Sequence, residues 1–123
     1  MSAVIAITNQ KGGVGKTTTA CSLLAGLRQQ GARVLGVDLD PQGSLGFCLG
    51  LDIEHCSTIY DVMRGTCSIQ EVVMPSECGD IVPSNILLSA AELEFNRPGR
   101  EFLLRNQLSE VQDQYDYIII DTP

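Results

Sequence analysis

The sequence is poor in several residue types that mark other classes of protein. Its 123 residues include no tryptophan, three tyrosines and three phenylalanines, so we expect an aliphatic core. The five cysteines include no pair at C-x-x-C spacing, which argues against a zinc ribbon or a thioredoxin-like site. The only histidine, His55, precedes Cys56. An ordinary loop histidine beside a thiol is a simpler interpretation of this pair than a metal site.

Positive charge is also scarce. Eight Lys and Arg residues stand against fifteen Asp and Glu residues, which gives a net charge of −7 and a pI of about 4.4. Because a nucleic-acid footprint needs clustered Lys and Arg, this stretch by itself is not expected to bind a phosphate backbone. The only lysines, Lys11 and Lys16, lie in one glycine-rich segment.

The sequence shows no membrane segment and no secretion signal. Its first apolar run is about five residues long and follows no positively charged stretch, so it fits neither a signal peptide nor a membrane span. Cysteines without paired spacing fit a reducing compartment, and we expect a cytoplasmic protein. The length and the hydrophobic content of 44% fit a single domain over residues 1–123.

The most informative stretch is a glycine-rich loop between an apolar run at 3–7 and an amphipathic helix expected at 18–30. Strand, glycine-rich turn, Lys-Thr and helix form the layout of a P-loop. The glycines let backbone N–H groups point into one concavity, to which the helix adds the positive end of its dipole. The residues predicted to bind nucleotide phosphates are Lys11, Gly12, Gly13, Val14, Gly15, Lys16, Thr17 and Thr18.

Aspartates end two further predicted strands. Asp38 and Asp40 follow the apolar run at 33–37, and Asp121 follows three isoleucines. Ligands of open α/β sheets bind at the carboxyl ends of the strands, where these residues are expected. Taken alone, Asp38 and Asp40 could belong to a solvated turn, and Asp121 could be an incidental aspartate at the end of a buried strand. Beside a P-loop we favour a Mg²⁺ site, with Thr17 and Asp121 as ligands, Asp121 through water as in a Walker B strand, and Asp38 near the metal.

The remaining sequence predicts covering elements without chemistry of their own. Short helices are expected at 58–65 and 68–73, the second with a capping box formed by Ser68 and Glu71. The sequence also predicts a strand at 80–85, a helix at 86–95 and a helix at 100–114. The last helix has an apolar stripe of Leu104, Leu108 and Val111.

Three motifs carry a family resemblance. The loop K-G-G-x-G-K-[ST]-[ST], the string V-D-L-D-P-Q-G and the D-T-P end resemble the deviant Walker A, switch I and switch II segments of the ParA/Soj-type ATPases in the ParA/MinD superfamily. The resemblance implies an α/β P-loop NTPase fold, a mostly parallel sheet with helices on both faces. Here it is truncated after the Walker B strand, so we expect the N-terminal part of a longer protein.

The resemblance also implies an activity. It implies a Mg²⁺-dependent ATPase that acts as an ATP-sandwich homodimer and binds DNA non-specifically, with hydrolysis stimulated by a centromere-binding ParB-like protein. Lys11 is implied to reach the γ-phosphate of the neighbouring subunit, Lys16 to hold the phosphates, and Asp40 to orient the attacking water. Gly12 is expected where two loops approach closely.

Other functions remain open at this point. A MinD-like membrane-associated regulator would need a C-terminal amphipathic helix, which this sequence cannot show, because the helix would lie beyond it. A metabolic P-loop enzyme, such as an amidotransferase-type synthetase or a nitrogenase-like reductase, is a further possibility, although no cysteine has a position recognisable for an iron–sulfur cluster. The stretch by itself is expected to hold the phosphate end of the site without the adenine end.

Overall fold

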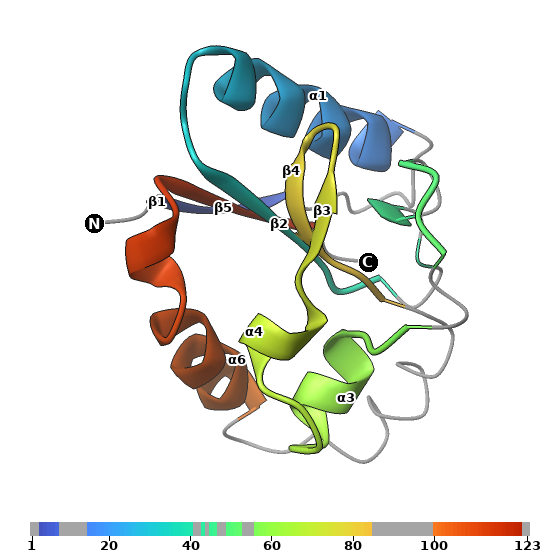
Figure 1. Ribbon diagram of the computed structural model, residues 1–123, viewed down its shortest axis with the longest axis vertical. Coiled ribbons are helices and arrows are strands. Elements are labelled where there is room, and N and C mark those ends of the chain that lie inside the picture. The colour runs from blue at the N-terminus through green and yellow to red at the C-terminus, as the bar shows by residue number, and fades with distance from the viewer. Residues whose placement is uncertain are drawn as a thin grey trace.

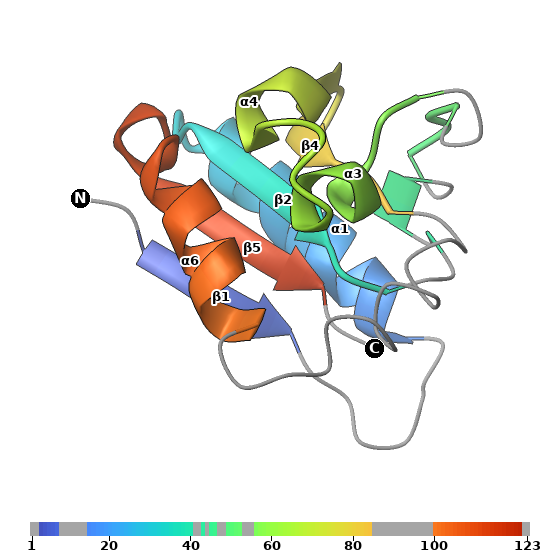
Figure 2. The ribbon, with the colours of Figure 1, turned by 90° about the horizontal axis from the view of Figure 1, so that it is seen from below.

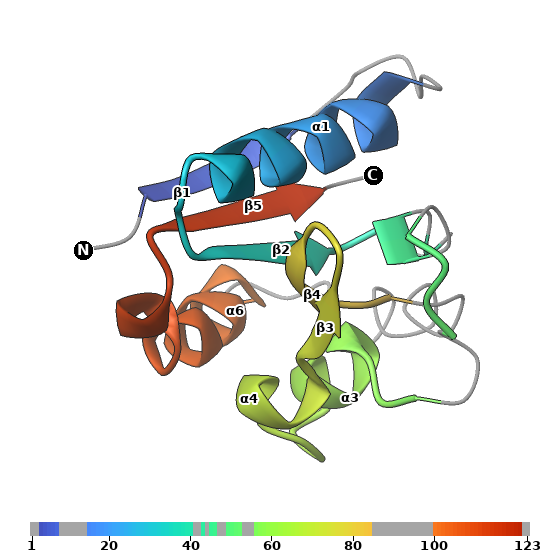
Figure 3. The same cartoon turned by 45° about the horizontal axis from the view of Figure 1, so that its top comes forward.

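The computed structural model contains one five-stranded sheet with helices on both faces (Figures 1 and 3). The structure describes residues 3–7, 15–40, 43, 45–46, 49–52, 56–84 and 100–121. Its elements are, in chain order, β1 (Ala3–Ile7), α1 (Gly15–Gln29), β2 (Val34–Asp38), α3 (Ile59–Met63), α4 (Ile69–Val72), β3 (Met74–Ser76), β4 (Gly79–Val82), α6 (Arg100–Ser109), the 3₁₀ helix η1 (Gln112–Gln114) and β5 (Tyr117–Asp121).

The strands lie in the order β1-β5-β2-β4-β3. The first four of these are parallel to one another, and β3 alone runs antiparallel, beside β4. The expected mostly parallel sheet is therefore confirmed. The β3–β4 hairpin was not predicted, because β3 is only three residues long and contains Pro75, which suits an edge strand and weakens the strand signal.

Successive side chains of the central strands point to opposite faces of the sheet, and each face carries its own apolar cluster. On one face, side chains of β2, β4 and β5 pack against α1, and this cluster consists of Ala20, Leu24, Val34, Leu45, Ile81 and Ile119. On the other face, α3, α4 and α6 cover the alternate residues of the same strands, which include Leu35, Val37, Val82, Ile118 and Ile120. Figure 3 shows α1 above the sheet and the other helices below it.

Helix α1 packs closely on the sheet because β2 has a glycine beneath it. A Cβ atom at Gly36 would lie 2.9 Å from Leu24 Cδ1 and 2.9 Å from Ile81 Cδ1. The predicted helix stop is confirmed: Gly31 has φ of 88°, and the Ala32 N–H donates to the Leu27 carbonyl at 3.1 Å. The close packing fixes where the start of α1 lies over the sheet.

The capping box was predicted at the wrong helix. Ser68 makes no side-chain capping bond to α4, and the Ile69 N–H donates instead to Gln107 Oε1 of α6 at 3.1 Å. The capping box is at α3, where the Tyr60 N–H donates to Thr58 Oγ1 at 3.2 Å and the Thr58 N–H to Asp61 Oδ2 at 2.9 Å. A tertiary contact therefore replaces the local cap at α4.

The predicted helix at 100–114 is two elements. Helix α6 ends at Ser109 and η1 follows it, while Leu108 and Val111 are buried and Leu104 packs against them, as the stripe predicted. The helix expected at 86–95 lies outside the described residues. No helix in the described ranges is long and apolar enough to cross a membrane.

Candidate functional site

Three strands end side by side at the carboxyl edge of the sheet. In the strand register, Asp121 of β5 is the partner of Ile7 of β1 on one side and of Asp38 of β2 on the other. Figures 2 and 3 show the start of α1 at this same edge. The strand that leads into the glycine-rich loop, the helix that leaves it and both predicted strand-end aspartates therefore meet at one edge.

The two aspartates also share a face of the sheet. Alternate residues point to the same side of a strand, so Asp38 lies on the face of Val34, and Asp121 on the face of Ile119. Both of these apolar residues belong to the cluster packed against α1. Lys16, Thr17 and Thr18 occupy the first turn of α1. The backbone thus brings the predicted Mg²⁺ residues to the side of the sheet on which the P-loop helix begins.

The Asp38 side chain is fully buried and held by two backbone groups. Its Oδ1 accepts a hydrogen bond from the Asp40 N–H at 2.9 Å, and its Oδ2 accepts one from the Leu45 N–H at 3.3 Å. The pKa of Asp38 is raised to about 7, mainly by burial and to a lesser degree by the charges of Asp121 and Asp40, while the two N–H donors oppose the rise.

Asp40 lies two residues after the end of β2 and is half-buried. The Leu39 N–H donates to the Asp121 carbonyl at 2.8 Å, so the contact between β2 and β5 continues one residue past the strand. The Asp40 carbonyl then accepts from the Gly43 N–H at 2.9 Å. Gly43 has φ of 66°, a conformation that favours glycine in such a turn. These bonds fix the backbone that carries the Asp40 carboxylate.

Asp121 is fully buried as well. Two neighbouring buried carboxylates repel each other and suit a cation site. Mg²⁺ commonly binds one or two carboxylates and completes its shell with phosphate oxygens and water. In the described part of the chain, no group of three or more His, Cys, Asp or Glu side chains could hold a metal. Two carboxylates fit the share of ligands that a protein commonly supplies to a Mg²⁺ ion whose other ligands come from a nucleotide and water.

The structure describes only some of the remaining predicted site residues. Residues 11–14 lie outside the described part of the chain, so the roles predicted for Lys11, Gly12, Gly13 and Val14 stay predictions. Gly15 begins α1. The residue missed by sequence reasoning is Leu45, whose backbone N–H completes the pair of donors to Asp38. No local signal marks this contact, because it joins residues seven positions apart in the sequence.

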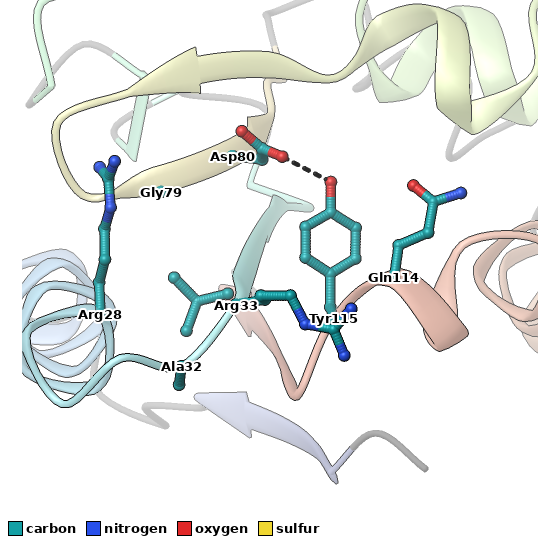
Figure 4. Close-up of a pocket in the computed structure, with 8 residues that line it drawn as sticks. Arg28, Ala32, Arg33, Gly79, Asp80, Gln114 and Tyr115 are labelled. Atoms are coloured by element: carbon teal, nitrogen blue, oxygen red, sulfur yellow. Dashed lines mark hydrogen bonds between the residues drawn. The ribbon is translucent and has the colours of Figure 1, made fainter.

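A cavity of about 310 Å³ lies at the opposite, amino edge of the sheet (Figure 4). Its charged groups are bound to protein atoms. Arg28 Nη1 donates to the carbonyls of Ser76 at 2.8 Å and Glu77 at 2.6 Å, and the Tyr115 hydroxyl donates to Asp80 Oδ2 at 2.8 Å. These contacts join α1, the β3–β4 hairpin and the start of β5. The charged groups around this cavity therefore hold the fold together, and the cavity is not the candidate site.

The strand–loop–helix start, the parallel sheet and the carboxylates at adjacent strand ends define an α/β P-loop NTPase. The profile of a family described as an AAA domain matches residues 2–123. The chain belongs to this family, within its ParA/Soj group of P-loop ATPases. The resemblance drawn from the three sequence motifs is therefore confirmed.

Two relatives illustrate the similarity in sequence. The chain is 46% identical over 124 residues to the chromosome partitioning protein ParA of Myxococcus xanthus, covering 98% of this chain and 44% of the relative. It is 44% identical over 129 residues to the sporulation initiation inhibitor protein Soj of Bacillus subtilis, covering 100% of this chain and 50% of the relative. The chain thus spans about half the length of the curated relatives it matches.

Among solved structures, the chain is similar to one described as cobyrinic acid a,c-diamide synthase from Mycobacterium smegmatis with bound ADP and magnesium. The TM-score is 0.93 and the sequence identity 42%, and the match covers 98% of this chain and 51% of that one. That structure's own ligands are ADP and magnesium.

Proposed function

We propose that the protein is an ATP-binding and ATP-hydrolysing dimerisation switch for chromosome or plasmid partitioning. The observation that carries the proposal is the pairing of buried Asp38 and Asp121 in register, on the face where α1 begins. The names of the relatives in Myxococcus xanthus and Bacillus subtilis support the partitioning role.

Phosphate binding is assigned to the loop and to the start of α1. The backbone N–H groups from Gly13 to Thr18 and the positive end of the helix dipole favour the negative charge of the β- and γ-phosphates. Lys16, in the first turn of α1, adds a full positive charge. The same charge at this point also stabilises the phosphoryl group during transfer, when charge spreads over its equatorial oxygens.

Mg²⁺ binding is assigned to Thr17 and Asp121, with Asp38 beside them. The Thr17 hydroxyl would hold the ion directly, and the Asp121 carboxylate would hold it through water. When bound, Mg²⁺ neutralises charge on the β- and γ-phosphate oxygens. The ion would also offset the repulsion between the two buried carboxylates.

Hydrolysis is assigned to Asp40 and Lys11. Asp40 orients the attacking water, and Lys11 stabilises the γ-phosphate bound to the neighbouring subunit. Because part of each site then comes from the other subunit, hydrolysis requires an ATP-sandwich homodimer. Gly12 lies at the close approach of the two loops, so a side chain there blocks dimerisation while ATP binding persists.

The output of the switch is DNA binding in the cytoplasm, at the nucleoid. The ATP-bound dimer holds DNA non-specifically, and a centromere-binding ParB-like protein stimulates hydrolysis and releases it. The chain has a net charge of −7, so the basic surface that contacts DNA is assigned to residues outside this stretch.

The test is retention of the protein on non-specific DNA with ATP, with ADP and without nucleotide. Retention with ATP alone is the expected result, and Lys11→Ala is expected to lose both retention and turnover. Arg64→Ala is the matched control, since it removes an exposed positive charge that lies over the Tyr60 ring on α3. A Lys11→Ala variant with wild-type ATPase activity would rule out the cross-dimer role.

A second candidate is a metabolic synthetase, favoured by the likeness to the structure described as a cobyrinic acid a,c-diamide synthase. A synthetase would show no ATP-dependent DNA retention, and its ATP hydrolysis would depend on a carboxylic acid substrate and a nitrogen donor. ATP-dependent binding to anionic vesicles in place of DNA would instead indicate a MinD-like regulator.

A further inference from the structure

Asp38 is bound to the two ends of a loop. Its two carboxylate oxygens accept hydrogen bonds from the backbone N–H groups of Asp40 and Leu45, at 2.9 and 3.3 Å. One buried side chain therefore spans the segment that begins with the proposed water-orienting aspartate. An aspartate that serves only as a metal ligand needs no such pair of backbone donors.

The far end of this segment is anchored in the core. The Leu45 side chain is fully buried and packs in the cluster with Leu24 of α1 and Ile119 of β5. The near end is fixed to β5, because the Leu39 N–H donates to the Asp121 carbonyl. Asp38 thus connects a fixed strand end to a fixed core residue, with Asp40 between them.

We infer that Asp38 is a positioning residue for Asp40, holding the backbone at Asp40 and at Leu45 in the arrangement that hydrolysis requires. This inference rests on the proposed function for its kinetic consequence, although the hydrogen bonds can be tested without it. Asp38 acts through the Asp40 and Leu45 backbone, and Asp121 keeps the role next to the metal.

The side-chain chemistry explains why an aspartate serves here. A carboxylate offers two acceptor oxygens, whereas asparagine offers one and alanine none. An Asp38→Asn variant can therefore keep one of the two bonds in a side chain of the same shape. Asp38→Ala loses both and leaves two N–H groups without their acceptor. The two variants should form a graded series.

The test is hydrogen exchange of the Asp40 and Leu45 amides in the nucleotide-free protein, measured by NMR. Hydrogen-bonded amides exchange through local opening. We expect exchange at both to be at least roughly tenfold faster in Asp38→Ala, and at one of them in Asp38→Asn. The Val37 amide, in the β2–β4–β5 part of the sheet, should stay unchanged and reports that the variant has folded.

Kinetics of the same variants separate positioning from metal binding. Asp38→Ala and Asp38→Asn should lower kcat in the order of their exchange rates, with little change in the KM for ATP or in its Mg²⁺ dependence. Asp40→Ala keeps its own backbone N–H, so it should lose turnover without faster exchange at Leu45. Asp113→Asn, an exposed aspartate of η1, controls for the change in charge.

Two results would overturn the inference. One is unchanged exchange at Asp40 and Leu45 in a folded Asp38→Ala variant. The other is faster exchange with unaltered kcat, or with a loss confined to Mg²⁺ affinity, which would make Asp38 a metal residue. If the wild-type protein hydrolyses no ATP, the proposed function fails, while the exchange experiment still decides whether Asp38 holds the loop.

Discussion

The two edges of the sheet arrange their carboxylates in different ways. At the carboxyl edge, two carboxylates lie near each other: Asp38 and Asp121 are register partners and both are buried. At the amino edge, Asp80 and Asp116 each lie against a side-chain donor. Asp80 accepts from the Tyr115 hydroxyl, and Asp116 accepts from the backbone and the guanidinium of Arg33.

This difference distinguishes the candidate functional site at the carboxyl edge from the structural contacts at the amino edge. Contacts at the amino edge satisfy one another and tie elements together, so folding alone accounts for them. At the carboxyl edge, burial disfavours the ionised state of Asp38 and raises its pKa, and the charge of Asp121 adds to the rise. A buried carboxyl group with a raised pKa, beside a second buried carboxylate, is typical of functional sites. Variants at the two edges should therefore affect different properties.

The largest effect is expected from Asp40→Ala at the carboxyl edge. Loss of the water-orienting carboxylate should lower ATP turnover roughly 100-fold or more, while ATP binding and dimerisation persist. Steady-state ATPase assays and nucleotide titration measure the two properties. Asp116→Ala, at the amino edge, is the matched control and should turn over ATP normally. Normal turnover by Asp40→Ala would discard its assignment.

The next effect concerns the pH dependence of stability. The pKa of Asp38 is raised from 3.8 to about 7 on folding, so between these values the native state binds more protons than the unfolded state. The contribution of Asp38 to the free energy of unfolding therefore falls as pH rises through this window, by an amount on the order of a few kcal/mol.

Asp38→Asn should remove this dependence. Denaturant unfolding of the nucleotide-free protein at pH 5 and pH 8 measures it, and the variant should lose less stability than wild type between the two values. Tyr115→Phe provides a comparison in which every carboxylate is kept. Parallel pH profiles for wild type and Asp38→Asn would show that burial does not perturb the Asp38 carboxyl group.

A smaller effect is expected from Tyr115→Phe at the amino edge. Tyr115 is buried and its hydroxyl donates to Asp80, so its loss should lower the free energy of unfolding by about 1–2 kcal/mol. Turnover should be unchanged, because the hydroxyl lies at the edge away from the site. A change in kcat with no change in stability would contradict the division of roles between the edges.

The smallest effect is expected from Asp116→Asn. The Arg33–Asp116 ion pair is 3.2 Å long but its side chains are 61% and 45% exposed, and solvent screens such pairs strongly. The Arg33 backbone N–H and guanidinium lower the pKa of Asp116. Unfolding midpoints at low and high salt should nonetheless differ little from wild type, and a large destabilisation would show that the pair is a main tie between β2 and β5.

Sequence patterns predicted the parts of the molecule that repeat regularly. The apolar periodicity of α1 and the runs before Asp38 and Asp121 were sufficient to place both aspartates at one sheet edge, since parallel strands share that edge. Patterns did not predict contacts between distant segments. At the start of α4, where Ser68 was expected to form the cap, Gln107 accepts a hydrogen bond from the helix backbone. The Leu45 N–H donates to Asp38, and no periodic pattern in the sequence between them indicates this contact.

The central claim is that the carboxyl edge binds the nucleotide together with Mg²⁺. Titration of a non-hydrolysable ATP analogue, with and without Mg²⁺, tests it directly on wild type, Asp121→Asn and Asp80→Asn. The account predicts that Mg²⁺ strengthens binding to wild type and Asp80→Asn, and that Asp121→Asn loses roughly tenfold or more of that gain. An equal Mg²⁺ effect on all three proteins would contradict it.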